Sequence, residues 1–231
     1  MDFSQFDIRH HPTVSVEEGY GEWARTYDEI DVGMLDKQLL ARIRTVPWAQ
    51  IRQAVDLACG TGRIGAWLQQ QGVETIDGID LTAEMLEQAR ARGIYRQLHL
   101  GDLRATPFEA GQYDLVTEVL ADEHVPELAP LYQEAARLAR VGGYFMLVGF
   151  HPYFLLRGIP TSFTRSPDES IAITSYVHLL SEHVQAALAE RLALREMYEW
   201  VVDEEWISKK PKRRQYQNWP MSFALVWQKE E

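Results

Sequence analysis

The chain has 231 residues, of which 46% are hydrophobic and 25% are charged, so it can bury a full core and is not disordered over most of its length. Acidic residues outnumber basic ones by 34 to 23, and the net charge of −11 disfavours nucleic acid as a partner, because phosphate backbones are repelled at long range. Cys59 is the only cysteine, which rules out an internal disulfide and fits a reducing compartment.

The first part of the chain predicts helices. One helix is expected over residues 16–30 and a second over residues 34–45. In the first of them, aromatic side chains are spaced three and four positions apart and therefore share one face: Tyr20, Trp23 and Tyr27. Neither a signal peptide nor an apolar run of the roughly 20 residues that span a bilayer is visible, so we expect a cytoplasmic protein.

From residue 51 onwards, short apolar runs alternate with helical stretches. The expected strands cover residues 54–58, 75–80, 96–100, 113–120 and 144–150. Helices are expected over residues 64–71, from Thr82 onwards and over residues 126–140. Strands that are apolar throughout are buried on both faces, which is typical of a parallel sheet covered by helices. The sequence therefore predicts an α/β fold with a Rossmann-like, mostly parallel sheet.

This alternation breaks at residues 151–175, where three prolines indicate an irregular insert or lid. A helix over residues 175–190 and two closing strands over residues 192–202 and 223–228 are expected to follow. The segment between those strands carries a run of cationic residues: Lys209, Lys210, Lys212, Arg213 and Arg214. Such a run is typical of a solvated loop, and the alternative is a binding site for an anionic substrate.

A glycine-rich loop, residues 60–65, stands between the first expected strand and the helix after it. Glycines there allow a ligand to approach the backbone, and the N-terminus of the helix offers free N–H groups. Asp80 ends the next strand, where an acid can bind ribose hydroxyls. The pattern predicts a nucleoside-containing cofactor, either a nicotinamide dinucleotide or S-adenosylmethionine.

Two further acids favour S-adenosylmethionine. Asp56 lies within the first strand, where a carboxylate suits the cationic amino group of a methionine moiety and would repel a pyrophosphate. Asp102 follows the third strand, where it can accept a hydrogen bond from the adenine amine. A nicotinamide-dependent oxidoreductase stays the rival interpretation of the glycine loop.

Residues 55–62 resemble motif I of the class I S-adenosylmethionine-dependent methyltransferases. Later segments resemble the other motifs of that family, namely residues 79–86, 101–103, 113–116 and 138–143. Residues 20–28 resemble the N-terminal helix that often closes over the cofactor. The resemblance covers about residues 16–150 and implies a seven-stranded sheet with one reversed strand, a lid in residues 1–50 and a core domain in residues 51–231.

Carried over position by position, the resemblance assigns residues to each part of S-adenosylmethionine. The methionine part would be surrounded by Asp56, Ala58, Gly60 and Gly62. The adenosine would be bound by Asp80, Leu81, Met85, Asp102 and Leu103, and the sulfonium side would be lined by Glu118 and Val119. Tyr27 would belong to the lid. Arg63, in the first turn of the following helix, is a further candidate for the methionine carboxylate. No spacing typical of metal ligands is present.

The resemblance implies methyl transfer to an oxygen or nitrogen atom of a small molecule, with residues 151–175 on the substrate side. His124 and His151 are candidate bases because each follows a strand of the sheet and imidazole titrates near neutral pH. Many relatives carry two histidines where this chain has Glu123 and His124. The motifs are also compatible with an RNA methyltransferase and with a non-catalytic module that binds S-adenosylmethionine.

Overall fold

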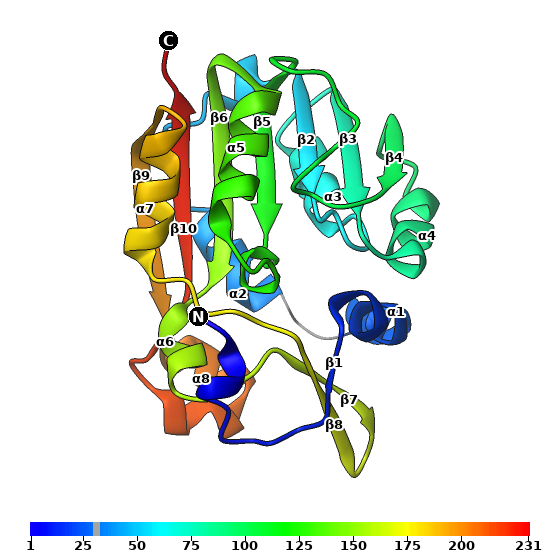
Figure 1. Ribbon diagram of the computed structural model, residues 1–231, viewed down its shortest axis with the longest axis vertical. Coiled ribbons are helices and arrows are strands. Elements are labelled where there is room, and N and C mark those ends of the chain that lie inside the picture. The colour runs from blue at the N-terminus through cyan, green and yellow to red at the C-terminus, as the bar shows by residue number, and fades with distance from the viewer. Residues whose placement is uncertain (30–32) are drawn as a thin grey trace.

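The computed structural model describes residues 1–29 and 33–231, and a seven-stranded sheet runs through the described part (Figure 1). In spatial order its strands are β4 (Gln97–Leu100), β3 (Thr75–Asp80), β2 (Gln53–Leu57), β5 (Tyr113–Val119), β6 (Ala139–Phe150), β10 (Pro220–Lys229) and β9 (Leu192–Val201). All of them run parallel except β10, which is antiparallel to both of its neighbours. The predicted α/β fold with one reversed strand is confirmed.

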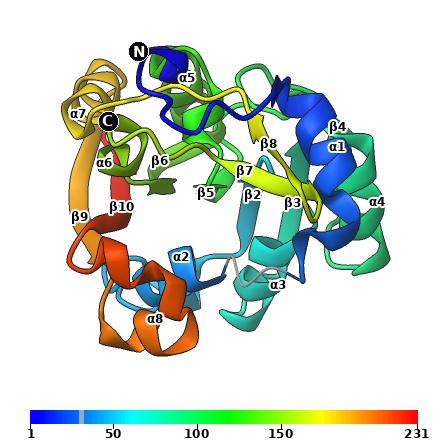
Figure 2. The ribbon, with the colours of Figure 1, turned by 90° about the horizontal axis from the view of Figure 1, so that it is seen from below.

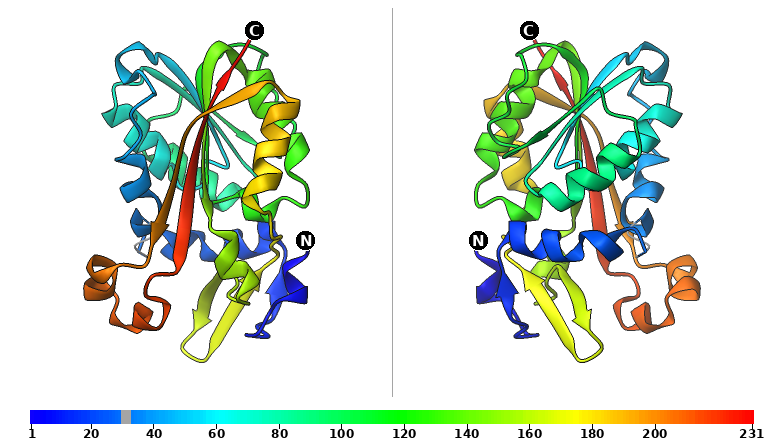
Figure 3. Two further views of the ribbon diagram at one scale, coloured as in Figure 1. Left: turned by 90° about the vertical axis from the view of Figure 1, so that its left-hand side faces the viewer. Right: turned by 90° about the vertical axis from the view of Figure 1, so that its right-hand side faces the viewer.

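Helices cover both faces of the sheet. Figure 3 shows α5 (Leu128–Leu138) and α7 (Leu180–Ala189) on one side, and α2 (Gly33–Leu40) and α3 (Arg63–Gln70) on the other. Strand β6 serves both cores, since Phe145 packs among the residues of α5 and α7 whereas Met146 packs among those of α2 and α3. This explains the continuous apolar runs, because successive side chains of a strand point to opposite faces of the sheet and both faces are buried. Full burial of one large apolar side chain stabilises the fold by about 1.5–3 kcal/mol.

The carboxyl ends of the parallel strands are covered by further elements. These are α1 (Val16–Tyr27), α4 (Ala83–Ala91), α6 (Pro152–Leu156), α8 (Glu204–Lys209) and a small sheet of β1 (Thr13–Val14), β8 (Glu169–Ile173) and β7 (Ser162–Ser166). Figure 2 views this end of the molecule, with α1 and the β7–β8 hairpin on one side and α8 on the other. Chain segments far apart in the sequence thus meet where strands β2, β3 and β5 end.

Residues 151–175 are more regular than the prolines indicated. They form α6 and the β7–β8 hairpin, and β8 pairs in parallel with β1. The hairpin is stabilised by packing of Phe163, Ile171 and Ile173 against Trp23 of α1. That contact joins distant parts of the chain, so no local pattern in the insert could indicate it.

Several boundaries also differ from the expectations. Helix α7 begins at Leu180 rather than at residue 175, because the N–H of Tyr176 donates to the carbonyl of Glu123 (2.6 Å) and that of Val177 to Met1 (2.7 Å). Strand β6 begins at Ala139, directly after α5. Helix α1 ends at Tyr27, and the expected end at residue 30 lies outside the described residues. Every helix in the described part is too short or too polar to cross a bilayer.

Candidate active site

The glycine loop after β2 has a backbone that few side chains tolerate. Ala58, Gly60 and Gly62 have φ angles of 53°, 52° and 83°, in the left-handed region. A β-carbon on Gly60 would meet no atom within 4 Å, so the backbone there borders open space. A non-glycine residue in this region, such as Ala58, carries strain of the kind that clusters at functional sites.

A cavity lies beside this loop and gathers most of the predicted cofactor residues. Its lining includes Tyr27, Ala58, Gly60, Asp80, Leu81, Met85, Asp102, Leu103 and Val119, together with the candidate base His124. The remaining lining residues were not singled out as cofactor-binding from the sequence: Val16, Tyr20, Thr82, Gly101, Arg104, Leu120, Ala121 and Val125. We call this space the first cavity.

Asp80 joins the glycine loop to the start of α4. Its carboxylate accepts hydrogen bonds from the backbone N–H groups of Gly60 (2.7 Å) and Thr82 (2.9 Å). The side chain is 8% exposed, and this burial raises the pKa of Asp80. A carboxylate has about four acceptor sites, so Asp80, which lines the cavity, can accept from a ligand as well.

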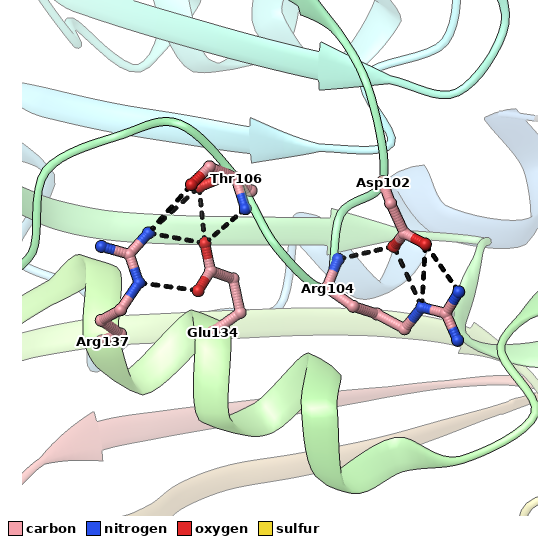
Figure 4. Close-up of polar contacts among 5 residues, drawn as sticks. All are labelled: Asp102, Arg104, Thr106, Glu134 and Arg137. Atoms are coloured by element: carbon pink, nitrogen blue, oxygen red, sulfur yellow. Dashed lines mark hydrogen bonds and ion pairs between the residues drawn. The ribbon is translucent and has the colours of Figure 1, made fainter.

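Asp102 is held by an arginine two residues later (Figure 4). The guanidinium of Arg104 donates to both carboxylate oxygens of Asp102, with Nη2 2.6 Å from Oδ2, and this pairing lowers the pKa of Asp102. The loop beyond is fixed to α5 because Glu134 accepts from Thr106 (2.6 Å and 2.8 Å) and pairs with Arg137 (2.7 Å). The first cavity therefore has a rigid wall on this side.

Four predicted cofactor residues are not among those that line the first cavity. Asp56 is buried beneath the loop, where it accepts from the hydroxyls of Tyr95 (2.8 Å) and Thr117 (2.8 Å). Gly62 makes room for Tyr95, since a β-carbon there would lie 3.0 Å from the ring. The other two are Arg63, which is paired with buried Asp36, and Glu118, which accepts from the N–H of Ala121 (2.6 Å). Their assignment to the cofactor stays a prediction.

Replacing Asp56 by asparagine should remove a pH dependence of stability. Burial raises the pKa of Asp56 from 3.8 to about 6, so the folded state binds the proton more tightly than the unfolded chain. The free energy of unfolding should therefore fall by about 3 kcal/mol, through this group, as the pH rises from about 4 to about 6.

Urea unfolding of both proteins between pH 4 and pH 6.5 measures this effect. As the pH rises, Asp56→Asn should become more stable relative to the wild type. The contributions of the other buried carboxyl groups are the same in both proteins and cancel in the comparison. A difference in unfolding free energy that stays constant over this range would show that folding does not raise the pKa of Asp56.

The two candidate bases have different surroundings. The Nδ1 of His124 lies 2.8 Å from the carbonyl oxygen of Thr174 and must donate to it, which in the neutral imidazole leaves Nε2 to accept from the hydroxyl of Tyr20 (2.9 Å). His151 caps α6 by accepting from the N–H of Tyr153 (3.1 Å), and its Nε2 lies 2.8 Å from Glu199. His124 lines the first cavity, whereas His151 is outside its described lining. A catalytic role for either histidine stays a prediction.

A second cavity of about 620 Å³ adjoins the first. The two share Tyr20, Tyr27 and Leu120 in their linings. The walls of the second cavity come from α1, from residues 159–162 and Ser170 around the hairpin, and from residues 206–216 in and after α8. The site thus consists of two adjoining spaces, with the aromatic residues of α1 between them.

Comparison with known proteins agrees with the motifs. Residues 55–147 match the family model of a methyltransferase domain. A ubiquinone biosynthesis O-methyltransferase of Marinobacter nauticus is 31% identical over 103 residues, covering 42% of this chain and 43% of that protein. Human methyltransferase-like protein 27 is 35% identical over 121 residues, covering 46% and 47%. The crystal structure of an S-adenosylmethionine-dependent methyltransferase from Mesorhizobium loti shares the fold, with a TM-score of 0.67 at 20% identity over 84% of this chain and 96% of that one.

Residues 55–147 therefore form a methyltransferase domain, and the relatives and the shared fold support a class I S-adenosylmethionine-dependent methyltransferase. The resemblance seen in the sequence is thereby confirmed, and S-adenosylmethionine replaces the nicotinamide alternative as the cofactor. The chain spans less than half the length of the two curated relatives named above. The matched domain, residues 55–147, carries most of the residues that line the first cavity, whereas the second cavity is largely built by residues outside it.

Proposed function

We propose that this methyltransferase transfers a methyl group from S-adenosylmethionine to an oxygen or nitrogen atom of a small molecule. The observation that carries the proposal is the pair of adjoining cavities, one beside the family motifs and one beyond the α1 residues Tyr20 and Tyr27. A donor in the first cavity and an acceptor in the second would meet at these tyrosines. Holding two reactants in line contributes roughly 7–11 kcal/mol of barrier reduction in the best cases.

The described residues of the first cavity fit the cofactor. Gly60 leaves open space beside its backbone, Asp80 offers carboxylate oxygens to ribose hydroxyls, and Met85 belongs to an apolar wall suited to adenine. Bound S-adenosylmethionine supplies an electrophilic methyl group on a cationic sulfur. The lining of the first cavity includes the carboxylates of Asp80 and Asp102 and the guanidinium of Arg104, and its negative balance favours that positive charge.

Tyr20 and His124 form a path for the proton that an acceptor hydroxyl must lose. As the acceptor oxygen attacks the methyl carbon, its proton passes to Oη of Tyr20, which gives its own proton to Nε2 of His124. Burial raises the pKa of Tyr20, so that its hydroxyl stays protonated and remains a donor to the imidazole. This pair favours oxygen as the methylated atom, as does the name of the Marinobacter relative.

We further propose that residues 1–50 act as a lid and that residues 151–175 form the substrate-side insert of a core domain spanning residues 51–231. Support comes from the linings, since α1 contributes to both cavities and residues 159–162 contribute to the second. A reaction in the cytoplasm is part of the proposal, on the composition alone.

Transfer of a labelled methyl group to a panel of small hydroxylated and amine compounds tests the proposal. We expect the purified protein to label at least one compound and to bind S-adenosylhomocysteine but not NADH in calorimetric titration. Binding of S-adenosylhomocysteine without turnover on any compound would favour a non-catalytic module. Labelling confined to RNA, with binding that collapses in added salt, would favour an RNA methyltransferase.

A further inference from the structure

The second cavity is basic although the chain as a whole is acidic. Its lining contains four cationic side chains, in a protein of net charge −11: Arg9, Lys210, Lys212 and Arg213. The one carboxylate among the described lining residues is that of Glu123, which is 3% exposed and accepts from the hydroxyl of Thr161 (3.2 Å). The cavity therefore presents concentrated positive charge where the rest of the molecule repels anions.

Two of these cations converge on one buried tyrosine. Nη2 of Arg9 donates to the hydroxyl of Tyr216 (2.9 Å), and the guanidinium carbon of Arg213 lies 5.7 Å from the centre of the same ring. Burial lowers the pKa of Arg213, and the nearby Arg9 lowers it further. Within residues 1–29 and 33–231, none of the four cations has a carboxylate within 4.0 Å.

This arrangement is built by distant parts of the chain. Arg9 comes from the N-terminal segment and Arg213 from the 3-10 helix Pro211–Tyr216, and the Arg9–Tyr216 hydrogen bond spans 207 positions. The neighbouring Arg214, by contrast, pairs with Glu204 (3.6 Å) and is outside the described lining. Two guanidinium groups on one tyrosine, with no carboxylate of the described residues paired to either, would be stabilised by a bound anion, because arginine recognises carboxylate and phosphate through paired donors.

Most of the other residues that line the second cavity are aromatic or apolar, and the polar ones are His11, Thr161, Ser162, Ser170 and Gln215. Aromatic and apolar side chains lie on several walls: Trp23, Leu35, Phe150, Ile159, Trp206 and Met221. A volume of about 620 Å³ falls within the range of pockets that hold drug-sized ligands. Tyr20 and Tyr27 mark the border with the first cavity, where the methyl group would arrive.

We propose that the methyl acceptor is an amphipathic acid, with a carboxylate or phosphate bound by Arg9 and Arg213, an apolar body among the aromatic side chains, and the methylated atom at Tyr20. This inference rests on the proposed function and specifies the substrate class for the same site. The anion determines which acceptor binds and in which orientation, and it takes no part in the methyl transfer itself.

Three probes that share one ring system test the anion site in the presence of S-adenosylhomocysteine: 2-naphthoate, 2-naphthyl phosphate and the neutral 2-naphthamide. We expect at least one of the two anions to bind about tenfold or more tightly than the amide, and added salt to weaken only the anions. The order of the two anions distinguishes a carboxylate acceptor from a phosphate acceptor. Calorimetric titration of the full chain measures all three.

Arg213→Gln and Arg214→Gln are matched variants at adjacent positions. Arg213→Gln should weaken the binding of the preferred anion by about tenfold or more and leave S-adenosylhomocysteine and 2-naphthamide unaffected, whereas Arg214→Gln should change none of them. Equal binding of amide and anions, no binding of either anion, or equal losses in the two variants would overturn the anion site. So would a short RNA oligonucleotide that outcompetes both naphthyl anions.

The same titrations separate this inference from the proposed function. Binding of an anion that depends on Arg213, in a protein that methylates no compound, would leave the anion site intact and overturn the methyltransferase activity. Methylation of neutral acceptors only, with unchanged kcat/KM in Arg213→Gln, would support the methyltransferase activity and overturn the anion site.

Discussion

Asp80→Ala should weaken the binding of S-adenosylhomocysteine by about a hundredfold. The carboxylate accepts from the N–H groups of Gly60 and Thr82, so its removal frees both the glycine loop and the start of α4. Hydrogen bonds to a charged group are worth about 1.5–3 kcal/mol each, and each 1.4 kcal/mol corresponds to about tenfold in affinity. In the proposed complex the ribose hydroxyls also lose their charged acceptor. Calorimetric titration measures the effect.

Two further variants show whether the loss belongs to the site. Glu87→Ala removes an exposed carboxylate from α4 and should leave the affinity unchanged. Asp80→Asn keeps an oxygen acceptor but no charge, and should fall between the wild type and Asp80→Ala. Circular dichroism confirms that each variant is folded. A folded Asp80→Ala protein with wild-type affinity would mean that the cofactor does not use this carboxylate.

The sheet could be predicted from the sequence because its signals are local. Each parallel strand is a short apolar run bounded by turn residues, and β3 was expected at the bounds that the structure shows, Thr75–Asp80. The position of Asp80 and Asp102 near one another also followed, since the carboxyl ends of parallel strands lie at one edge of the sheet. Residues after those ends form most of the first cavity.

Long-range partners could not be predicted in the same way. The assignment of Asp56 to the cofactor stays a prediction, and nothing in the sequence indicated that its oxygens accept from Tyr95 and Thr117, which lie 39 and 61 positions away. A buried carboxylate takes whichever donors the fold brings to it, and sequence spacing gives no sign of them. The β7–β8 hairpin was missed for the same reason, because its packing partner Trp23 lies in α1.

The position of the cationic residues in the second cavity depends on the fold and could not be predicted from the local sequence. The cationic run in residues 209–214 was interpreted mainly as a solvated loop, and for Arg214 that holds, since it pairs with Glu204 in an exposed position. Lys210, Lys212 and Arg213 instead line a cavity with Arg9. Which residues of this short 3-10 helix line the cavity depends on how the helix packs beside α8, and the composition of the run does not reveal that packing.

Tyr20→Phe should lower kcat for a hydroxyl acceptor by about a hundredfold or more, because general acid–base catalysis contributes about 10²–10⁴-fold. Phenylalanine keeps the ring at the border of the two cavities and removes only the hydroxyl that bonds to His124. The affinity for S-adenosylhomocysteine should therefore change by less than about threefold. Steady-state kinetics with labelled methyl donor measure kcat and KM separately.

The partner histidine makes the test specific to proton transfer. His124→Asn should lower kcat by a similar factor, and the double variant should lose little more, since residues that act as one unit are strongly non-additive. Tyr144→Phe serves as the control, because Tyr144 is absent from the described linings of both cavities and its hydroxyl bonds only to Gln228 (3.3 Å) among its described neighbours. Two results would contradict proton transfer through Tyr20 to His124: losses in kcat that simply multiply in the double variant, or a Tyr20→Phe enzyme with normal kcat. An amine acceptor adds a further distinction, since a neutral amine attacks before it loses its proton and should be much less sensitive to both substitutions.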